Sequence, residues 1–249
     1  MKNYDVVIVG AGAAGLFLCR ELSKAKKTVL LVDSKKDIFN FSFKTLGSFI
    51  NLERFNLSEK VVAQKINHLV IASNTVSNSI KTVAYTLDKE ELHKEMYSQI
   101  DHNYVTILFD TKITSIQKET NNSFTAIKDK SGNKYSGKVF VDASGTQGIL
   151  SKQLKLVEKK PTLATGVEYN VKYKGDTNTM YLLLGKDYKG GYGWIFPLKN
   201  NRAIIGFGSI KKEVIKELKP RLHKILELKS IKKLVEKDNN NVEGGSIPI

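Results

Sequence analysis

The chain has 249 residues, 41% of them hydrophobic and 26% charged, which is typical of a water-soluble globular protein with one or two domains. The net charge is +15, but the lysines are spread along the chain, so a lysine-rich composition explains it better than a nucleic-acid surface. No apolar run approaches the ~20 residues of a membrane span, and the single Cys19 excludes an internal disulfide. We therefore expect a cytoplasmic protein with no nucleic-acid partner.

The N-terminal residues predict a β-α-β unit, the crossover of a parallel sheet. Tyr4–Val9 is a short apolar run typical of a buried strand, and Gly10–Gly15 is a glycine-rich turn. Leu16–Lys24 has the spacing of a helix, and Thr28–Val32 is a second buried strand.

The next hundred residues are less regular. Ser34–Ser79 shows no clear periodicity, whereas Asp88–Ile100 predicts a helix. After it we expect an antiparallel meander with a turn at Ser131–Asn133, and then a short buried strand that leads into Asp142-Ala143-Ser144-Gly145. The expected strands are Val105–Phe109, Lys112–Gln117, Ser123–Lys128 and Lys138–Val141.

The pattern changes near residue 160. We expect an antiparallel sheet, followed by one or two amphipathic helices over Lys211–Lys237. The predicted fold class is α/β, with a Rossmann-like domain over 1–159 and an α+β substrate domain over 160–249. The strands expected in the second domain are Gly166–Lys172, Thr179–Leu184, Gly191–Pro197 and Arg202–Gly208.

The glycine-rich turn predicts a dinucleotide site. Gly10, Gly12 and Gly15 have the spacing that allows a tight turn, a close approach to a pyrophosphate, and packing of helix on strand. The N-terminus of the following helix would face the phosphates. Asp33 ends the second strand, where a carboxylate can accept hydrogen bonds from a ribose diol.

Two later segments indicate a family. Lys138–Leu154 is a strand followed by Asp-Ala-Ser-Gly and a helix start, and Gly191–Gly208 contains Gly-Trp-Ile-Phe-Pro and then Ile-Gly-Phe-Gly. With the N-terminal turn, they resemble the geranylgeranyl reductase family of FAD-dependent oxidoreductases. That family belongs to a broader group with p-hydroxybenzoate hydroxylase, lycopene cyclases and flavin-dependent halogenases. The resemblance implies an FAD domain interrupted by a substrate domain.

The resemblance also implies roles for individual residues. The pyrophosphate would be held by Gly10, Gly12, Ala13, Ala14 and Gly15. The adenosine ribose would be bound by Asp33, the edge of the adenosine would lie at Ser34 and Lys35, and the adenine would meet the backbone of Ile113. Asp142 and Gly145 would lie near the pyrophosphate and ribityl chain.

Lys89 stands where the family usually has an Arg that reaches the cofactor. The lysine keeps the positive charge but cannot form the two parallel hydrogen bonds of a guanidinium group. Trp194, Phe196 and Pro197 would line the substrate cavity, although ordinary core packing explains Trp194 and Phe196 equally well.

The implied activity is hydride transfer through the flavin to an isoprenoid or another hydrophobic substrate, with a reduced nicotinamide or a ferredoxin-type protein as electron donor. No catalytic residue is identified; Tyr192, His68 and Tyr85 are candidate proton donors, each more often structural. No pattern indicates a metal site. Three alternatives stay open: a lycopene cyclase-like or hydroxylase-like flavoprotein, a flavoprotein fragment without activity alone, and an NAD-dependent dehydrogenase.

Two further segments bear on partners. The basic helical region Lys211–Lys237 would suit peripheral contact with an anionic membrane that holds a prenyl-lipid substrate, but packing on the substrate sheet is the favoured interpretation. Val242–Ile249 resembles an internal segment of the family that returns the chain to the FAD domain before a Gly-Asp motif. We therefore expect a truncated product, or half of a split flavoprotein with a separate C-terminal half, that holds FAD weakly alone.

Overall fold

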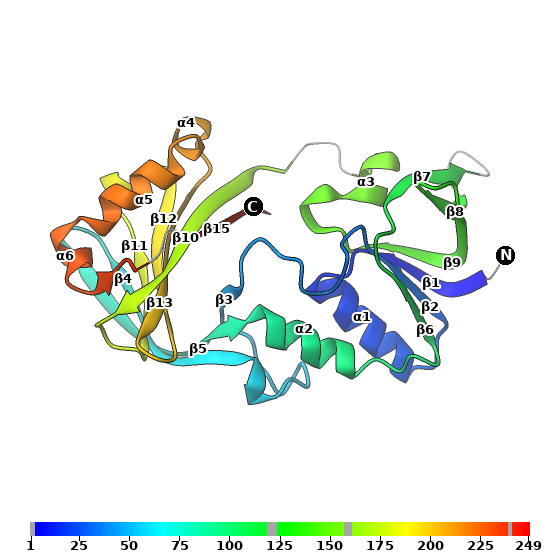
Figure 1. Cartoon of the computed structure of the whole chain (residues 1–249), viewed down its shortest axis with the longest axis horizontal. Helices are drawn as coiled ribbons and strands as arrows, with labels where there is room; N and C mark the ends of the chain where they lie inside the picture. The colour runs from blue at the N-terminus through cyan, green and yellow to red at the C-terminus, as the bar shows by residue number, and fades with distance from the viewer. Residues whose placement is uncertain (1–2, 119–123, 157–160, 239–240) are drawn as a thin grey trace. The chain divides into compact units, whose positions relative to one another are not determined.

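The computed structural model describes residues 3–118, 124–156, 161–238 and 241–249, which form two compact units (Figure 1). The first unit comprises Met1–Asn40 and Glu90–Lys160, and the second comprises Phe41–Lys89 and Pro161–Ile249. The expected boundary at 159/160 lies outside the described residues, one residue from this division. Residues 41–89, expected in the first domain, instead fold with the second unit, because their strands hydrogen-bond into its sheet.

The first unit is built on a six-stranded sheet in the order β6-β2-β1-β9-β8-β7. Strands β6, β2, β1 and β9 run parallel to one another, and β8 and β7 continue the sheet antiparallel. The strands are β1 (Asn3–Val9), β2 (Val29–Val32), β6 (Val105–Leu108), β7 (Ile113–Lys118), β8 (Phe124–Asp129) and β9 (Lys134–Asp142).

The antiparallel meander differs from the one expected. It consists of β7, β8 and β9, whereas β6 pairs in parallel with β2. The helix α2 (Lys89–Ser98) precedes β6 along the chain, so this strand has the crossover connection that a parallel partner needs. The sequence pattern of β6 is equally compatible with either pairing, and tertiary hydrogen bonding decided between them.

Helices cover both faces of this sheet. Helix α1 (Ala13–Lys24) buries residues at helical spacing, and the short helix α3 (Ile149–Gln153) contributes Leu150 to the core on the other face. Cys19 is fully buried in α1, and burial raises its thiol pKa to about 12, so it is a core residue and not a nucleophile. The core that includes Leu150 is formed by Tyr4, Val7, Val9, Leu30, Val32, Ile113, Ile127 and Leu150.

The second unit is built on a nine-stranded sheet in the order β14-β10-β13-β12-β11-β4-β5-β3, with β15 also paired to β10. All pairs are antiparallel except β11 with β4. The strands are β3 (Thr45–Ser48), β4 (Val62–Ala72), β5 (Ser77–Asp88), β10 (Leu163–Tyr173), β11 (Thr179–Leu183), β12 (Gly191–Leu198), β13 (Arg202–Ser209), β14 (Val235–Glu236) and β15 (Val242–Pro248). The short 3-10 helices of the chain are Glu59–Val61, Gly145–Gln147 and Lys186–Tyr188.

The expectation that Ser34–Ser79 is irregular was wrong for β3, β4 and the start of β5. The pairing of β4 with β5 shifts register between Val62 and Gln64 and again between Ile66 and His68. Each shift moves the following side chains to the other face of the strand, which erases the alternation that predicts a strand from sequence.

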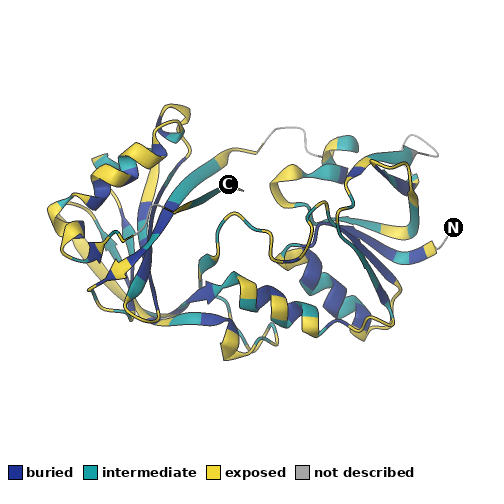
Figure 2. Cartoon of the chain, in the orientation of Figure 1, coloured by how far each residue is buried: buried dark blue, intermediate teal, exposed yellow. Residues whose placement is uncertain are grey.

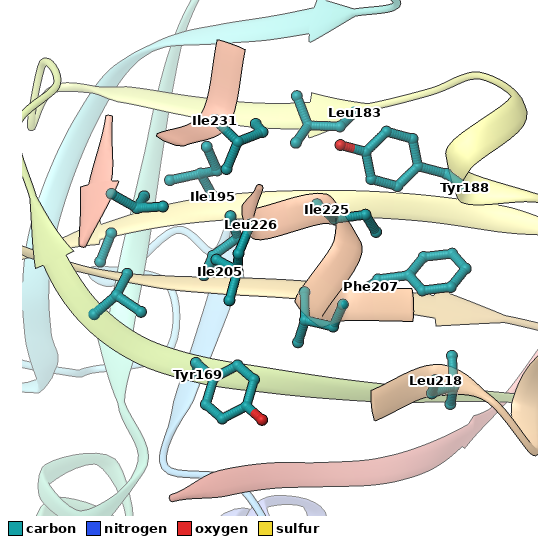
Figure 3. Packing of buried hydrophobic residues seen from close by; sticks show 14 of the residues in the cluster. Tyr169, Leu183, Tyr188, Ile195, Ile205, Phe207, Leu218, Ile225, Leu226 and Ile231 are labelled. Atoms are coloured by element: carbon teal, nitrogen blue, oxygen red, sulfur yellow. The ribbon is translucent and has the colours of Figure 1, made fainter. Parts of the chain in front are cut away.

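Three short helices cover one face of the second sheet: α4 (Lys212–Ile215), α5 (Leu218–Leu226) and α6 (Lys229–Lys232). Apolar side chains of all three helices belong to one core cluster with Ile195 and Ile205 of the sheet, and Figure 3 shows Leu226 and Ile231 beside these two residues. Helix α5 is buried on this side, and its other side is exposed (Figure 2). Pro220 lies in the first turn of α5, where its missing N–H costs no helical bond. The apolar face of this basic region therefore packs on the sheet, as the favoured interpretation had it. Among the described residues no helix is long and apolar enough to cross a membrane.

Candidate functional site

The first unit contains a cavity of about 220 Å³ at the carboxyl ends of β1 and β2. Parallel sheets bind ligands at this edge, where loops from neighbouring strands meet. Seven of the twelve residues predicted to bind the cofactor line it: Gly10, Gly12, Asp33, Ser34, Lys35, Ile113 and Gly145. It is completed by Val9, Val32, Thr111, Ala143, Ser144, Gln147 and Ile149.

The three glycines of the turn differ in what requires them. A β-carbon on Gly10 would lie 2.3 Å from the carbonyl oxygen of Ala143, and one on Gly15 would lie 1.9 Å from the carbonyl oxygen of Gly10. Both positions therefore need glycine for packing. A β-carbon on Gly12 would meet no described atom within 4 Å, and Gly12 has an ordinary extended backbone with φ of −80°. The open space beside Gly12 is what a close-lying phosphate group needs.

Asp33 is held in place by the turn that it faces. Its Oδ2 accepts a 2.6 Å hydrogen bond from the N–H of Ala11, and its Oδ1 accepts a 2.9 Å hydrogen bond from the N–H of Lys35. Each carboxylate oxygen has a second lone pair, so both can still accept a bond from a hydroxyl group. This arrangement fixes a hydrogen-bond acceptor at the cavity wall.

Asp142 does not line the cavity. Its carboxylate accepts hydrogen bonds from the N–H groups of Ser144, Leu150 and Ser151 and from the hydroxyl groups of both serines. Burial alone would raise the pKa of Asp142, but these hydrogen bonds outweigh it and lower the pKa. The Asp-Ala-Ser-Gly segment thus uses its aspartate to fix the loop before α3, while Gly145 reaches the cavity.

Three other predicted residues also lie elsewhere. Ala13 and Ala14 form the exposed first turn of α1 and are not among the lining residues. Lys89 belongs to the second unit, where its Nζ lies 3.9 Å from the ring centre of Phe43 and 4.7 Å from that of Phe41. The side chain predicted to reach the cofactor is therefore engaged in cation–π contacts.

The second unit contains its own cavity, of about 460 Å³ and mainly apolar. Of the three residues predicted to line a substrate cavity, Trp194 and Phe196 of β12 line this one, and Pro197 does not. Successive side chains of a strand point to opposite faces, so the buried Pro197 lies with Ile195 on the face that the helices cover. Tyr192 of β12 also lines the cavity, other strands contribute Thr45, Glu168 and Ile247, and Phe43 comes from the loop before β3.

Glycines on neighbouring strands make room for these aromatic rings. A β-carbon on Gly206 would lie 2.2 Å from the indole of Trp194, and one on Gly166 would lie 2.8 Å from it. A β-carbon on Gly47 of β3 would lie 2.9 Å from the ring of Phe196. The Gly-Phe-Gly motif of β13 thus lets the indole lie flat across the sheet, which explains why it follows the Trp-Ile-Phe-Pro motif.

Glu168 is a buried carboxyl in this apolar cavity, and sequence reasoning missed it. It is 8% exposed, and the indole N–H of Trp194 donates a 3.0 Å hydrogen bond to its Oε2. Its Oε1 has no hydrogen-bond partner among the described residues, and neither has the buried hydroxyl of Thr45, also in the cavity wall. Burial raises the pKa of Glu168 from its ordinary value of 4.5 to about 7, although the bond from Trp194 opposes this. The available signal was a lone acidic residue within the predicted strand Gly166–Lys172.

The proton donors considered from the sequence are placed differently. Tyr192 lines the second cavity, but it is 44% exposed. His68 on β4 and Tyr85 on β5 are not among the lining residues. Within the part of the chain that the structure describes, no cluster of His, Cys, Asp or Glu could hold a metal ion.

Solved structures with a similar fold include flavin-dependent enzymes. The chain superposes over its full length on a geranylgeranyl bacteriochlorophyll reductase-like protein from Thermoplasma acidophilum, with a TM-score of 0.83, 18% sequence identity and 67% coverage of that protein. The match to a family model extends over residues 5–247, and the chain belongs to this family, lycopene cyclase protein.

Curated relatives are named as reductases. The chain is 27% identical over 224 residues to digeranylgeranylglycerophospholipid reductase 3 of Methanosphaera stadtmanae, with 83% of this chain and 56% of the relative aligned. It is 24% identical over 225 residues to digeranylgeranylglycerophospholipid reductase of Haloferax volcanii, with 85% of this chain and 55% of the relative aligned. The chain thus spans a little over half the length of these relatives.

Proposed function

We propose that this chain is an FAD-dependent oxidoreductase of the geranylgeranyl reductase type, which reduces carbon–carbon double bonds of an isoprenoid or other hydrophobic substrate. The observation that carries the proposal is the apolar cavity of the second unit, whose wall is formed by aromatic side chains and glycines. A flexible hydrocarbon chain fits such a wall, since it offers dispersion contacts and few polar groups to satisfy. The names of the curated relatives support the same substrate class.

The proposed FAD site is the cavity of the first unit. Gly12 would admit the pyrophosphate, Asp33 would accept hydrogen bonds from the adenosine ribose, and Ser34 and Lys35 would lie at the adenosine edge. The N-terminus of α1 would favour the negative charge of the phosphates. When bound, FAD supplies hydride transfer, and the protein supplies orientation and exclusion of water.

The electron donor and the partners are part of this proposal. A reduced nicotinamide or a ferredoxin-type protein would reduce the flavin, and the prenyl-lipid substrate would bring the protein to the membrane surface. A separate C-terminal half is a further proposed partner. Its addition would raise the affinity for FAD if it supplies additional contacts to the phosphates.

The test uses the full chain with added FAD. Bound flavin is measured by its visible absorbance after gel filtration, reduced with dithionite without oxygen, and then mixed with geranylgeraniol. We expect the flavin band to return and the lipid to gain the mass of two hydrogen atoms for each reduced bond. Loss of FAD binding in Gly12→Ala, with retained folding, would assign the binding to the proposed cavity. A chain that binds no flavin even at saturating FAD, or whose reduced flavin is reoxidised only by oxygen, contradicts the proposal.

A second candidate is a cyclase-type flavoprotein, which the match to the lycopene cyclase family favours. Such an enzyme rearranges double bonds without net reduction. The same incubation distinguishes the two candidates, because a cyclised product has the mass of its substrate and a reduced product is heavier.

A further inference from the structure

We propose that Glu168 is the proton donor to the substrate alkene, with Oε1 as the atom that carries the proton. This inference rests on the proposed reductase function and adds to it the residue that completes the reaction. Reduction of an isolated double bond requires a proton at one carbon as well as a hydride at the other, and the protein must supply the proton.

The position of Glu168 supports this role. Glu168 lies on β10 in the wall of the apolar cavity, and Oε1 is buried without a hydrogen-bond partner among the described residues. A buried polar atom that lacks a partner is costly, so it is rarely retained unless a ligand or a reaction uses it. Thr45 Oγ1 is a second such atom in the same wall. Two unsatisfied polar atoms in one apolar cavity indicate a place where a group of the bound substrate reacts or binds.

The orientation of the Glu168 carboxyl group supports the choice of Oε1. Trp194 donates its indole N–H to Oε2 of Glu168, which leaves Oε1 as the oxygen available to carry a proton. Gly206 of β13 pairs with both Glu168 of β10 and Trp194 of β12 in the sheet. The strand pairing therefore places the indole across β13, the strand that lies between β10 and β12. A neutral carboxylic acid held at one oxygen can donate from the other.

The protonation state of Glu168 also fits this role. The charged groups near Glu168 are Glu243, its pairing partner on β15, and Lys89 at the end of the second unit's first segment. The burial of Glu168 and, to a smaller extent, the charge of Glu243 favour the neutral acid, whereas the Trp194 hydrogen bond and the charge of Lys89 favour the carboxylate. The net effect raises the pKa to about 7, which suits a group that gives up and regains a proton near neutral pH.

The proposed step balances in atoms and electrons. The carbon–carbon π bond would break, one carbon would take the proton of Glu168, and the other would take a hydride, which bound reduced FAD would supply as the two-electron donor. The O–H bond of Glu168 would be exchanged for a C–H bond. The resulting carboxylate regains its proton from water before the next turnover.

A first experiment measures the acid without flavin or substrate. Trp194 is the only tryptophan in the chain, so its fluorescence reports on the group that its N–H contacts. We expect a titration of this fluorescence with a midpoint near 7 that is absent in Glu168→Gln and shifted to lower pH in Glu243→Gln. Glu236→Gln, a change at an exposed glutamate bonded to Lys172, is the matched control and should titrate as the wild type does. A transition that persists in Glu168→Gln overturns the inference.

A second experiment measures turnover of the FAD-loaded chain. We expect Glu168→Gln to bind FAD and to be reduced by dithionite as the wild type is, but to be reoxidised by geranylgeraniol at least about 100-fold more slowly. Glu168→Asp, which keeps an acid, should recover part of the rate. If Glu168→Gln keeps pace with the wild type, the inference fails alone; if the wild type itself is not reoxidised, the proposed function fails and the inference with it.

Discussion

The indole N–H of Trp194 donates a 3.0 Å hydrogen bond to Oε2 of Glu168 across Gly206, the residue that pairs with both in the sheet. This relationship joins the aromatic motif of β12, the Gly-Phe-Gly motif of β13 and the carboxyl of β10. Three strands thus place one acidic group in an apolar cavity.

Gly206→Ala should displace the indole, because the new β-carbon would lie 2.2 Å from two of its ring atoms. We expect a loss of about 1–3 kcal/mol in the free energy of unfolding, as for other overpacked sites. Urea denaturation followed by circular dichroism measures the loss, and the fluorescence of Trp194 should also lose its dependence on pH near 7. An unchanged stability would show that the indole has another place to lie.

Glu168→Gln should stabilise the chain above pH 7. The folded state holds the Glu168 proton more tightly than the unfolded state, since the pKa is about 7 instead of 4.5. The contribution of Glu168 to the free energy of unfolding of the wild type is therefore fully present below pH 4.5 and is lost as the pH rises through 7. The Gln variant does not titrate, so its free energy of unfolding relative to the wild type should increase by up to about 3 kcal/mol between pH 4.5 and pH 8.

Urea titrations of the wild type and Glu168→Gln at pH 5 and pH 8 measure that difference. Glu236→Gln serves as the control, because Glu236 is exposed and its pKa is lowered by hydrogen bonds from Lys172 and Lys174. A difference between wild type and Glu168→Gln that is the same at both pH values would contradict a raised pKa for Glu168.

Gly12→Ala should weaken FAD binding without destabilising the fold. Its β-carbon would enter open space with an ordinary backbone conformation, so no protein atom opposes it. The same carbon would occupy the place of a phosphate group, and we expect the dissociation constant for FAD to rise about tenfold or more.

The matched control for that change is Gly15→Ala. Its β-carbon would lie 1.9 Å from the carbonyl oxygen of Gly10, so it should lower the thermal midpoint even without FAD. Titration with FAD followed by flavin fluorescence, together with thermal melts of both apo variants, separates the two effects. Equal destabilisation of both variants would show that Gly12 is also needed for packing.

Asp142→Asn should destabilise the first unit at neutral pH by about 1–2 kcal/mol, the usual value of a lost helix cap. Asp142 accepts hydrogen bonds from the N–H groups of Leu150 and Ser151. Its pKa is lowered, which means that the charged carboxylate is the form that stabilises the fold. Its contribution is present above its ordinary pKa of 3.8 and is lost as the pH falls below it. The difference between wild type and variant, measured by urea denaturation, should therefore shrink in acid.

The local sequence was sufficient to predict those features that depend on residues close together in the chain. Gly10, Gly12 and Gly15, between a buried strand and a helix, predict the β-α-β unit and its cavity, because glycine spacing and apolar runs act over few residues. Cys19 was likewise correctly assigned to the core. The same reasoning assigned Asp142 to the cofactor, although the backbone N–H groups of α3 occupy its carboxylate.

The spacing of glycines and apolar runs was therefore enough to predict the glycine-rich turn, the strand–helix order around it, and the two motifs that carry the family resemblance. Hydrogen bonding between distant segments was needed to show that residues 41–89 join the second unit, that β6 is parallel, and that Glu168 meets Trp194. The difference lies in the range of the interactions. Turn and helix preferences are local, whereas strand pairing between distant segments sets which side chains share a face and which carboxyl is removed from water.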